Sequence, residues 1–371
     1  MKHYRWQILI VLLTLALVGV LLLTRQPSLT PTVVEPASGG VYTEALIGSF
    51  SRLNPLYDLA NPADRDVNRL IFSSLFRFDS RGVPQPDLVE SWGVSADGTV
   101  YNLTLRPNLL WHDGQPLTTE DVLFTLDVLR SQFSAYTDDV RALWDSVEIT
   151  VLDGRNIKFV LQEPFAPFLD YLTFGVLPKH LLSTTPPDQM LLAEFNFSPV
   201  GSGPYRFEKL LVEDNRIAGV VLTRFDGYYG AKPFIEQIVF RYYPDAASAL
   251  AAYRNGDVLG ISQITLDVLP EALQEPNLAF YSSRMPRLTM ILFNLQNDEV
   301  RFLQDKSIRR ALLLALNRQW IIDRYLQGQG IVADSPLLPD TWAYYNGVER
   351  LPYDPEAAAA LLKEGRLCFA C

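Results

Sequence analysis

The chain has 371 residues, of which 48% are apolar and 20% are charged, so it is long enough for two or more domains and apolar enough for a large core. This composition excludes a disordered or collagen-like chain. The net charge of −10 gives the chain no attraction for phosphate backbones, so we expect no nucleic-acid partner. With three histidines and two cysteines, a disulfide scaffold or a Cys/His zinc site is nearly excluded.

Residues 1–25 have the pattern of a signal peptide or a membrane anchor. Lys2, His3 and Arg5 form a basic start, and an apolar run over residues 8–23 follows. Sixteen residues give a helix of roughly 24 Å, slightly short of a bilayer core and longer than the apolar region of a typical signal peptide. We favour an uncleaved anchor over a cleaved signal, because no convincing cleavage site follows. A buried core helix fits poorly, because the run is apolar all round behind a basic leader.

Residues 26–40 are expected to form a flexible linker, since they hold three prolines and end in a Gly-Gly pair. Whether or not the first segment is cleaved, the basic residues stay inside and the rest is exported. We therefore expect an extracytoplasmic protein, in the periplasm or on the outer face of the cell membrane. No cysteine occurs before residue 368, so this exported part must gain its stability from packing.

The folded part mixes strands and helices without a regular βαβ rhythm, which predicts an α/β protein with mixed sheets. In the first half of the chain we expect a strand over 41–50, a helix over 64–78, a strand over 101–105, a helix after Thr118, a hairpin over 147–161 and a short helix framed by Pro164 and Pro167. In the second half we expect strands near 198–211, 217–224 and 235–243, a helix over 245–254, and strands over 278–283 and 288–295. A helix from Ser307 and a last helix that begins at Asp354-Pro355 follow.

Two of these predictions depend on specific local signals. Thr118 is a predicted N-cap, with Asp121 three residues on as a weak capping box before apolar residues at helical spacing. Residues 147–161 give the clearest hairpin signal, because two β-rich runs flank Asp153-Gly154.

No catalytic residues are predicted. His112 and Asp113 are the one His–acid neighbour pair in the exported part, but adjacent side chains do not usually face each other, and Asp-Gly follows as a turn signal. Gly201-Ser202-Gly203 lacks the spacing of a nucleophile loop, and a proline stands where a helix should begin. We interpret both segments as tight turns, the second with glycines where a β-carbon would be blocked.

No metal or cofactor site is predicted either. Asp58, Asp64 and Asp66 do not have EF-hand spacing, and we interpret them as the solvated start of a helix. Cys368 and Cys371 have redox spacing but no following helix to lower a thiol pKa. Neither a phosphate-binding loop nor a Rossmann glycine pattern occurs.

Several segments, in order, resemble one family. Between residues 75 and 129 lie PDLVESW, SADGTVYNLTLR and WHDGQPLTTEDV, and later come SPVGSGPYRF, RFDGYYGAKPFIEQIVFR, AYRNGDVLG, SIRRALLLALNRQWII and YDPEAAAALLKEG. Together they are similar to the extracytoplasmic solute-binding proteins of ABC importers, in the peptide/nickel-binding family that includes dipeptide- and oligopeptide-binding proteins. The resemblance is collinear over about residues 41–365.

The resemblance implies an α/β, two-lobed, periplasmic-binding-protein-like fold with mixed sheets, whose lobes close on a ligand about a hinge. Lobe I would comprise residues 41–53 and 197–285, and an extra subdomain of that lobe would comprise residues 54–196. Lobe II would comprise residues 286–371. Family members continue beyond the last matching segment, so we expect a C-terminally truncated chain with an incomplete second lobe.

The resemblance also implies a ligand site. By position in the family pattern, the contacts would be Phe50 and Ser51 after the first strand, Ser262 and Gln263 after GDVLG, and Asn294 in LFN. Tyr136 is a further candidate from the extra subdomain. Packing in loops or at strand ends is the alternative interpretation of each residue.

The function that the resemblance implies is binding of a peptide or similar small solute and delivery to ABC permease subunits in the membrane. The peptide would lie extended between the lobes, paired to the backbone like an added strand. Nickel ranks below peptide, because the exported part holds two histidines and no Met/His/Cys cluster. A membrane-anchored extracytoplasmic hydrolase and an inactive fragment are the alternatives.

Overall fold

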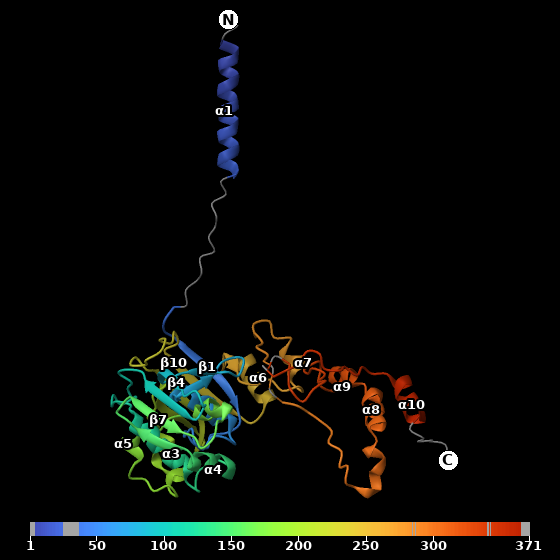
Figure 1. The fold of residues 1–371 in the computed structure, drawn as a ribbon. Helices are drawn as coiled ribbons and strands as arrows, with labels where there is room; N and C mark the ends of the chain where they lie inside the picture. The colour runs from blue at the N-terminus through green and yellow to red at the C-terminus, as the bar shows by residue number, and fades with distance from the viewer. Residues whose placement is uncertain are drawn as a thin grey trace. The chain divides into compact units, whose positions relative to one another are not determined.

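The computed structural model describes residues 4–24, 37–283, 285, 287–339, 341 and 343–364. It divides into two compact units, residues 1–39 and residues 40–371. The first unit contains α1 (Tyr4–Thr24), drawn in blue in Figure 1. Among the helices described, none is both long enough and apolar enough to cross a membrane. The linker residues 26–36 and the pair Cys368 and Cys371 lie outside the described residues.

The second unit is built on a five-stranded mixed sheet in the order β11-β1-β10-β9-β8. β1 (Val41–Ile47) runs parallel to both of its neighbours, β10 (Gln237–Tyr243) and β11 (Gly260–Ile261). β9 (Arg216–Arg224) and β8 (Tyr205–Glu213) continue the sheet in antiparallel pairs. The carboxyl ends of β1, β10 and β11 therefore meet at one edge of the sheet.

One face of this sheet is covered by α6 (Ala246–Asn255), which lies beside β1 and β10 in Figure 1. Ala249 and Ala252 of the helix form a buried cluster with Ala45 of β1. Asp245 is the N-cap residue, and its side chain accepts a hydrogen bond from Ser248 N. Gly256 is the C-cap residue, and its φ of +80° suits glycine. Small side chains at this contact let helix and sheet approach closely.

A second, four-stranded antiparallel sheet has the order β4-β5-β7-β6. Its hairpin, β6 (Glu148–Val151) with β7 (Asn156–Val160), confirms the Asp153-Gly154 turn signal. The other two strands are β4 (Val89–Val94) and β5 (Val100–Leu105), and a small hairpin pairs β2 (Phe76–Phe78) with β3 (Pro84–Pro86). Behind the sheet lies an aromatic core in which Trp144, Phe159 and Phe168 are fully buried, with ring centroids 5.7–6.2 Å apart in tilted or edge-to-face pairs.

The helices beside this sheet are α3 (Thr119–Arg130) and α4 (Asp138–Ser146). The capping box is present, because Thr118 N donates to the Asp121 carboxylate and the Thr118 hydroxyl caps the helix in return. The helix expected over 64–78 is wrong at its end: α2 (Pro62–Ile71) ends at Ile71, and residues 76–78 form β2. Phe76 is completely buried as a strand residue. The free energy gained by this burial outweighs the helical preference that the spacing of the neighbouring apolar residues indicates.

Shorter helical segments connect these elements: η1 (Ala166–Leu172), α5 (Lys179–Leu182), η2 (Met190–Leu192), η3 (Glu194–Phe197) and α7 (Leu269–Ala272). The 3₁₀ helix η1 is the expected aromatic-rich helix, but Pro167 lies in its first turn and does not mark its end.

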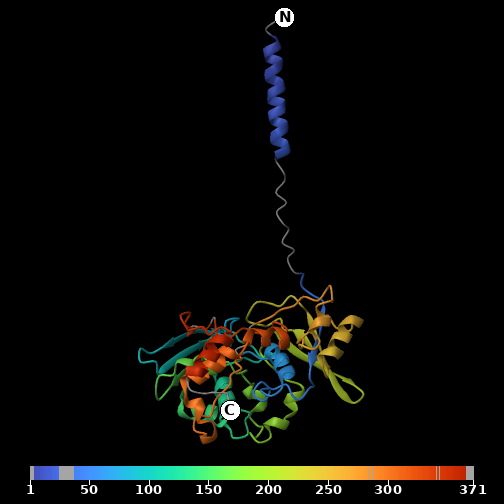
Figure 2. The same ribbon diagram turned by 90° about the vertical axis from the view of Figure 1, so that its right-hand side faces the viewer.

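Beyond α7 the described residues form helices joined by turns and irregular segments. η4 (Asp298–Gln304), α8 (Lys306–Ala315), α9 (Arg318–Tyr325) and α10 (Pro355–Glu364) follow one another, and α8 and α10 lie side by side in Figures 1 and 2 through a cluster of Ala311, Leu314 and Ala358. The strands expected over 278–283 and 288–295 are not present among the described residues. A strand needs a backbone partner, and the described part of the chain provides none there.

Candidate functional site

The carboxyl edge of the parallel strands brings together two segments that are about 210 residues apart in the chain. Phe50 and Ser51 follow β1, and Ser262 and Gln263 follow β11. Ser262 N donates to the carbonyl oxygen of Ala45 at 2.9 Å, which fixes the two exits side by side. Four of the six residues predicted as ligand contacts therefore lie at one edge of the sheet. Such an edge is a common ligand site in open α/β sheets.

A cluster of aromatic side chains lies at this edge of the sheet. The half-buried ring of Phe50 lies 5.8 Å from the ring of Phe197 and 6.3 Å from that of Tyr242, at the carboxyl end of β10. The Tyr242 hydroxyl is buried and has no hydrogen-bond partner among the described residues. Burial is the main cause that raises its pKa, and the nearby Asp64 carboxylate adds to it. The cluster is thus apolar, and it encloses one buried hydroxyl that makes no hydrogen bond to a described residue.

Asp64 holds the loop that carries Phe50 and Ser51. Its carboxylate accepts hydrogen bonds from Ser51 N at 3.1 Å, Arg52 N at 2.9 Å and Asn61 Nδ2 at 2.7 Å. Asp64 is fully buried in the first turn of α2, so its interpretation as a solvated residue is wrong. Burial raises the pKa of Asp64, and the hydrogen bonds from Arg52 and Ser51 oppose that rise. The Ser51 N–H is engaged by this carboxylate, while the Ser51 side chain stays exposed.

Asp58 is a second buried carboxylate near the same loop, and its interpretation as solvated is also wrong. Its side chain is only 5% exposed, and its Oδ2 accepts a hydrogen bond from Asn68 Nδ2 at 2.9 Å. Burial raises the pKa of Asp58 to about 6, although the bond from Asn68 lowers it. Tyr136 lies in the segment between α3 and α4. Burial raises the pKa of its phenol, and the negative charge of Asp58 adds a smaller contribution. Within the described residues, no hydrogen bond or ring contact joins Tyr136 to the residues at the carboxyl edge of the sheet.

Asn294 is the other predicted contact that the structure does not bring to this group. It is exposed, and its hydrogen bonds are local: its Oδ1 accepts from Gln296 N at 3.1 Å, and its carbonyl oxygen accepts from Asn297 N. Sequence reasoning missed Tyr242, Phe197 and Asp64. The Asn61-Pro62 pair is a helix-start signal that would have placed Asp64 at the third helical position.

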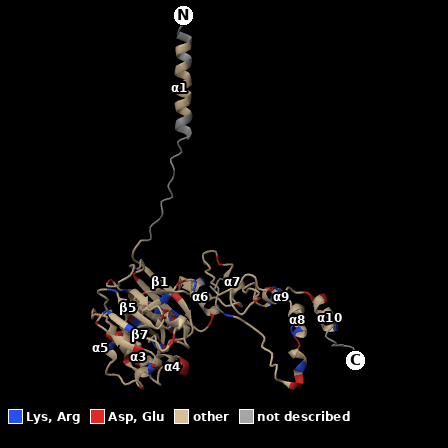
Figure 3. Cartoon of the chain, in the orientation of Figure 1, with Lys and Arg blue, Asp and Glu red and all other residues tan. Residues whose placement is uncertain are grey.

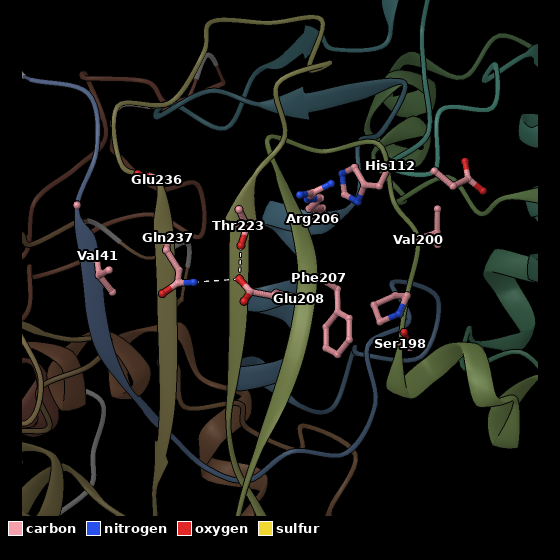
Figure 4. A pocket seen from close by; sticks show the side chains of 13 residues that line it. Val41, His112, Ser198, Val200, Arg206, Phe207, Glu208, Thr223, Glu236 and Gln237 are labelled. Carbon is pink, nitrogen blue, oxygen red and sulfur yellow. Dashed lines mark hydrogen bonds between the residues drawn. The ribbon is translucent and has the colours of Figure 1, made fainter.

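A cavity of about 850 Å³ lies at the opposite end of β1, on the face of β8 and β9 (Figure 4). Glu208 stands at its centre and accepts hydrogen bonds from the Thr223 hydroxyl and from Gln237 Nε2, the latter at 2.9 Å. Arg206 and His112 form the upper wall in this view. The volume suits a small ligand. None of the six predicted contacts lines this cavity.

His112 has a structural role in that wall. Its Nδ1 accepts a hydrogen bond from Gly201 N at 3.2 Å, and its Nε2 lies 3.0 Å from the carbonyl oxygen of Gly203. Burial lowers the pKa of His112 to about 4, so the ring is neutral and donates through Nε2. Asp113 bonds instead to His180, at 2.7 Å, which confirms the interpretation of His112 and Asp113 as turn residues rather than a facing pair.

The Gly201–Gly203 turn packs against α2. A β-carbon at Gly201 would overlap the carbonyl oxygen of Ile71, and Gly203 N donates to that same oxygen at 2.8 Å. This confirms the interpretation of the turn as a close approach. In the described part of the chain, no group of three or more His, Cys, Asp or Glu side chains is placed to hold a metal ion.

Comparison with known proteins adds a family match. A family model described as "Bacterial extracellular solute-binding proteins, family 5 Middle" matches residues 83–367. The chain is 30% identical to the dipeptide-binding protein of Escherichia coli, over 76% of this chain and 55% of that protein. It is 27% identical to the oligopeptide-binding protein AppA of Bacillus subtilis, over 89% of this chain and 60% of that protein.

A solved structure shares the fold. NikZ from Campylobacter jejuni, in complex with Ni(L-His), matches with a TM-score of 0.67 and 29% identity, over 87% of this chain and 62% of that chain. The chain thus spans between half and two thirds of the length of these relatives.

Proposed function

Because this chain belongs to family 5 of the bacterial extracellular solute-binding proteins, we propose that it is the substrate-binding component of an ABC importer. Its ligand would be a peptide or a similar small solute, and it would deliver that ligand to permease subunits in the membrane. The observation that carries the proposal is the 30% identity to a dipeptide-binding protein over 76% of this chain.

The proposed site is the carboxyl edge of β1, β10 and β11. There the side chains of Ser51, Ser262 and Gln263 are exposed, and the ring of Phe50 is half-buried against Phe197 and Tyr242. An aromatic wall with polar groups at its rim is the kind of surface that accepts varied side chains. Tyr136 and Asn294 complete the proposed contacts, Tyr136 from the extra subdomain over 54–196 and Asn294 from the second lobe.

Closure of the lobes would complete the site. We assign residues 41–53 and 197–285 to lobe I and residues from 286 onward to lobe II. A ligand shifts such an equilibrium only through contacts that it makes in the closed form. No covalent step is proposed, because the family is one of solute-binding proteins.

Nickel is the second candidate, and it is favoured by one comparison. NikZ, 29% identical to this chain, was crystallised with Ni(L-His). Within the described residues, no side-chain cluster could hold a bare ion. A metal ligand would therefore have to arrive already chelated, and we rank it below peptide.

The first segment is proposed to direct export and to remain as an anchor through residues 8–23. The support is the basic start followed by an apolar run. Expression in a bacterial host followed by membrane fractionation and intact-mass measurement tests this. We expect the full mass in the membrane fraction, and a shortened chain in the soluble extracytoplasmic fraction would contradict it.

The binding proposal is tested by adding mixtures of di-, tri- and longer peptides to the full chain while following tryptophan fluorescence. Mass spectrometry of the same samples identifies bound peptides and detects any cleavage. We expect saturable binding of intact peptides. Ni(L-His) in a parallel titration tests the second candidate. Cleavage products formed without added protease would overturn the proposal in favour of a hydrolase.

A pair of variants tests the site. Phe50→Ala removes the ring at the proposed wall, and we expect it to weaken peptide binding about tenfold or more, which corresponds to about 1.4 kcal/mol. Phe234→Ala, in the loop before β10 with a side chain that is 53% exposed, is the matched control and should bind as the parent does. Equal affinities of both variants, each with a melting temperature near that of the parent, would remove Phe50 from the site.

A further inference from the structure

A second cavity, of about 310 Å³, lies away from the proposed solute site. Arg77 of β2, Arg106 just after β5 and Tyr228 in the loop between β9 and β10 contribute to its wall. Because that loop joins the carboxyl end of β9 to the amino end of β10, the cavity lies at the end of β10 opposite to the candidate ligand edge.

Arg106 is held in a fixed orientation. Its Nε donates to the carbonyl oxygen of Asp87 at 2.7 Å, and its guanidinium carbon lies 5.8 Å from the centre of the Tyr229 ring. The two terminal nitrogens of Arg106 have no hydrogen-bond partner among the described residues. An arginine fixed through Nε and by an aromatic face keeps two parallel donors for a ligand.

Arg77 adds a second cationic group without an intramolecular partner. Its side chain is exposed and makes neither a hydrogen bond nor an ion pair within the described part of the chain. Burial raises the pKa of the Tyr228 hydroxyl, and the positive charges of Arg77 and Arg106 act against that rise. This agrees with the position of Arg77, Arg106 and Tyr228 in the wall of one cavity.

The one carboxylate in the wall does not pair with either arginine. Asp87 Oδ1 accepts the hydroxyl of Tyr229 at 2.6 Å, and its Oδ2 accepts from Ser74 N at 3.2 Å. Neutral donors thus engage both of its oxygens. Two arginines and one carboxylate leave the wall with a net positive charge, in a chain of net charge −10 whose acidic and basic residues are otherwise interspersed (Figure 3).

We propose that this cavity binds a small oxyanion, a free phosphate or carboxylate group, between the guanidinium groups of Arg77 and Arg106. The planar donors of arginine match the geometry of both anions. The volume of about 310 Å³ is at the lower end for ligand pockets, so it favours a small anion over an extended peptide. The Tyr228 hydroxyl supplies a further polar group at the same cavity.

The test is a calorimetric titration of the full chain with sodium phosphate and, separately, with sodium acetate, each at ionic strength held constant with sodium chloride. We expect saturable binding of at least one anion, and the stronger of the two identifies the preferred class. Arg77→Gln should weaken that binding about tenfold or more, because one of two charged partners is lost. Arg77 has no intramolecular bond to lose, so the variant should melt with the parent.

Arg81→Gln is the matched control. Arg81 lies in the turn between β2 and β3, is exposed, and pairs only with Asp79. It should bind the anion as the parent does. The absence of saturable binding of either anion to the parent would overturn the proposal, and so would equal weakening in Arg77→Gln and Arg81→Gln. Failure of peptide binding would not affect these outcomes, because the two sites lie at opposite ends of β10.

Discussion

Substitution of Asp58 by asparagine should remove a pH dependence of folding stability. The Asp58 carboxyl is 5% exposed, and burial raises its pKa from 3.8 to about 6. The charged groups around it are Arg65, Arg69 and Asp64, and its hydrogen-bond donor is Asn68. Asparagine keeps the shape of the side chain and an oxygen for the Asn68 amide, but it carries no charge to desolvate.

The sign and size follow from the raised pKa. Because the folded state holds the Asp58 proton more tightly than the unfolded state, stability is highest below the unfolded pKa of 3.8 and falls as the pH rises towards 6. A shift from 3.8 to about 6 corresponds to about 3 kcal/mol when complete. We therefore expect Asp58→Asn to be more stable than the parent by about 3 kcal/mol at pH 7 and by about 0.5 kcal/mol at pH 4.

The measurement is urea unfolding between pH 4 and pH 8, followed by the fluorescence of the fully buried Trp111 and Trp144. Asp188→Asn, at an exposed position, is the control and should follow the parent at every pH. A difference between Asp58→Asn and the parent that is the same at pH 4 and pH 7 would refute the reasoning, since the gain would then not come from the proton.

Two further predictions concern packing and exposed apolar surface. Gly201→Ala should destabilise the protein by about 2 kcal/mol or more, because the new methyl group would overlap the Ile71 carbonyl oxygen. Gly93→Ala is the control and should change the melting temperature little, because the space around Gly93 is open. Similar shifts of the melting temperature in both variants would contradict the packing argument. Ile291 and Leu292 are 71% and 82% exposed in a segment without helix or strand, so we expect the protein to self-associate through this apolar surface. Replacing both residues by serine should reduce that association in analytical ultracentrifugation, and a monomeric parent, or association that the replacement leaves unchanged, would contradict the prediction.

Local signals predicted those elements whose causes lie within a few residues of sequence. The capping box at Thr118 and Asp121 and the hairpin turn at Asp153-Gly154 both form as expected. In each case the hydrogen bonds that define the element join residues no more than a few positions apart. Contacts with distant parts of the chain therefore have little influence on whether these two elements form.

Elements that depend on distant partners were predicted less well. The helical spacing over 64–78 continued past Ile71, where the packing of Phe76 with the residues of β3 decides the structure instead. We expected a strand over 288–295 as well, but a strand forms only where a second backbone pairs with it. Neither partner is visible from the segment itself.

The candidate site was predicted in part. The resemblance pointed to Phe50, Ser51 and the residues after β11, and the parallel pairing of β1 with β11 brings these segments together. Tyr242 was missed, because its position depends on the register of β10 against β1, in which Ile47 pairs with Tyr243. No local pattern specifies that register.

Hydrogen–deuterium exchange with and without a saturating peptide mixture tests the central claim most directly, because it reports both binding and its location. The account predicts slower exchange on peptide binding in segments 48–52 and 260–264, at the carboxyl edge of the sheet, with no change over 84–87 beside the second cavity. Binding without protection at that edge would contradict the assigned site. Failure of every peptide to bind, or its cleavage, would contradict the function.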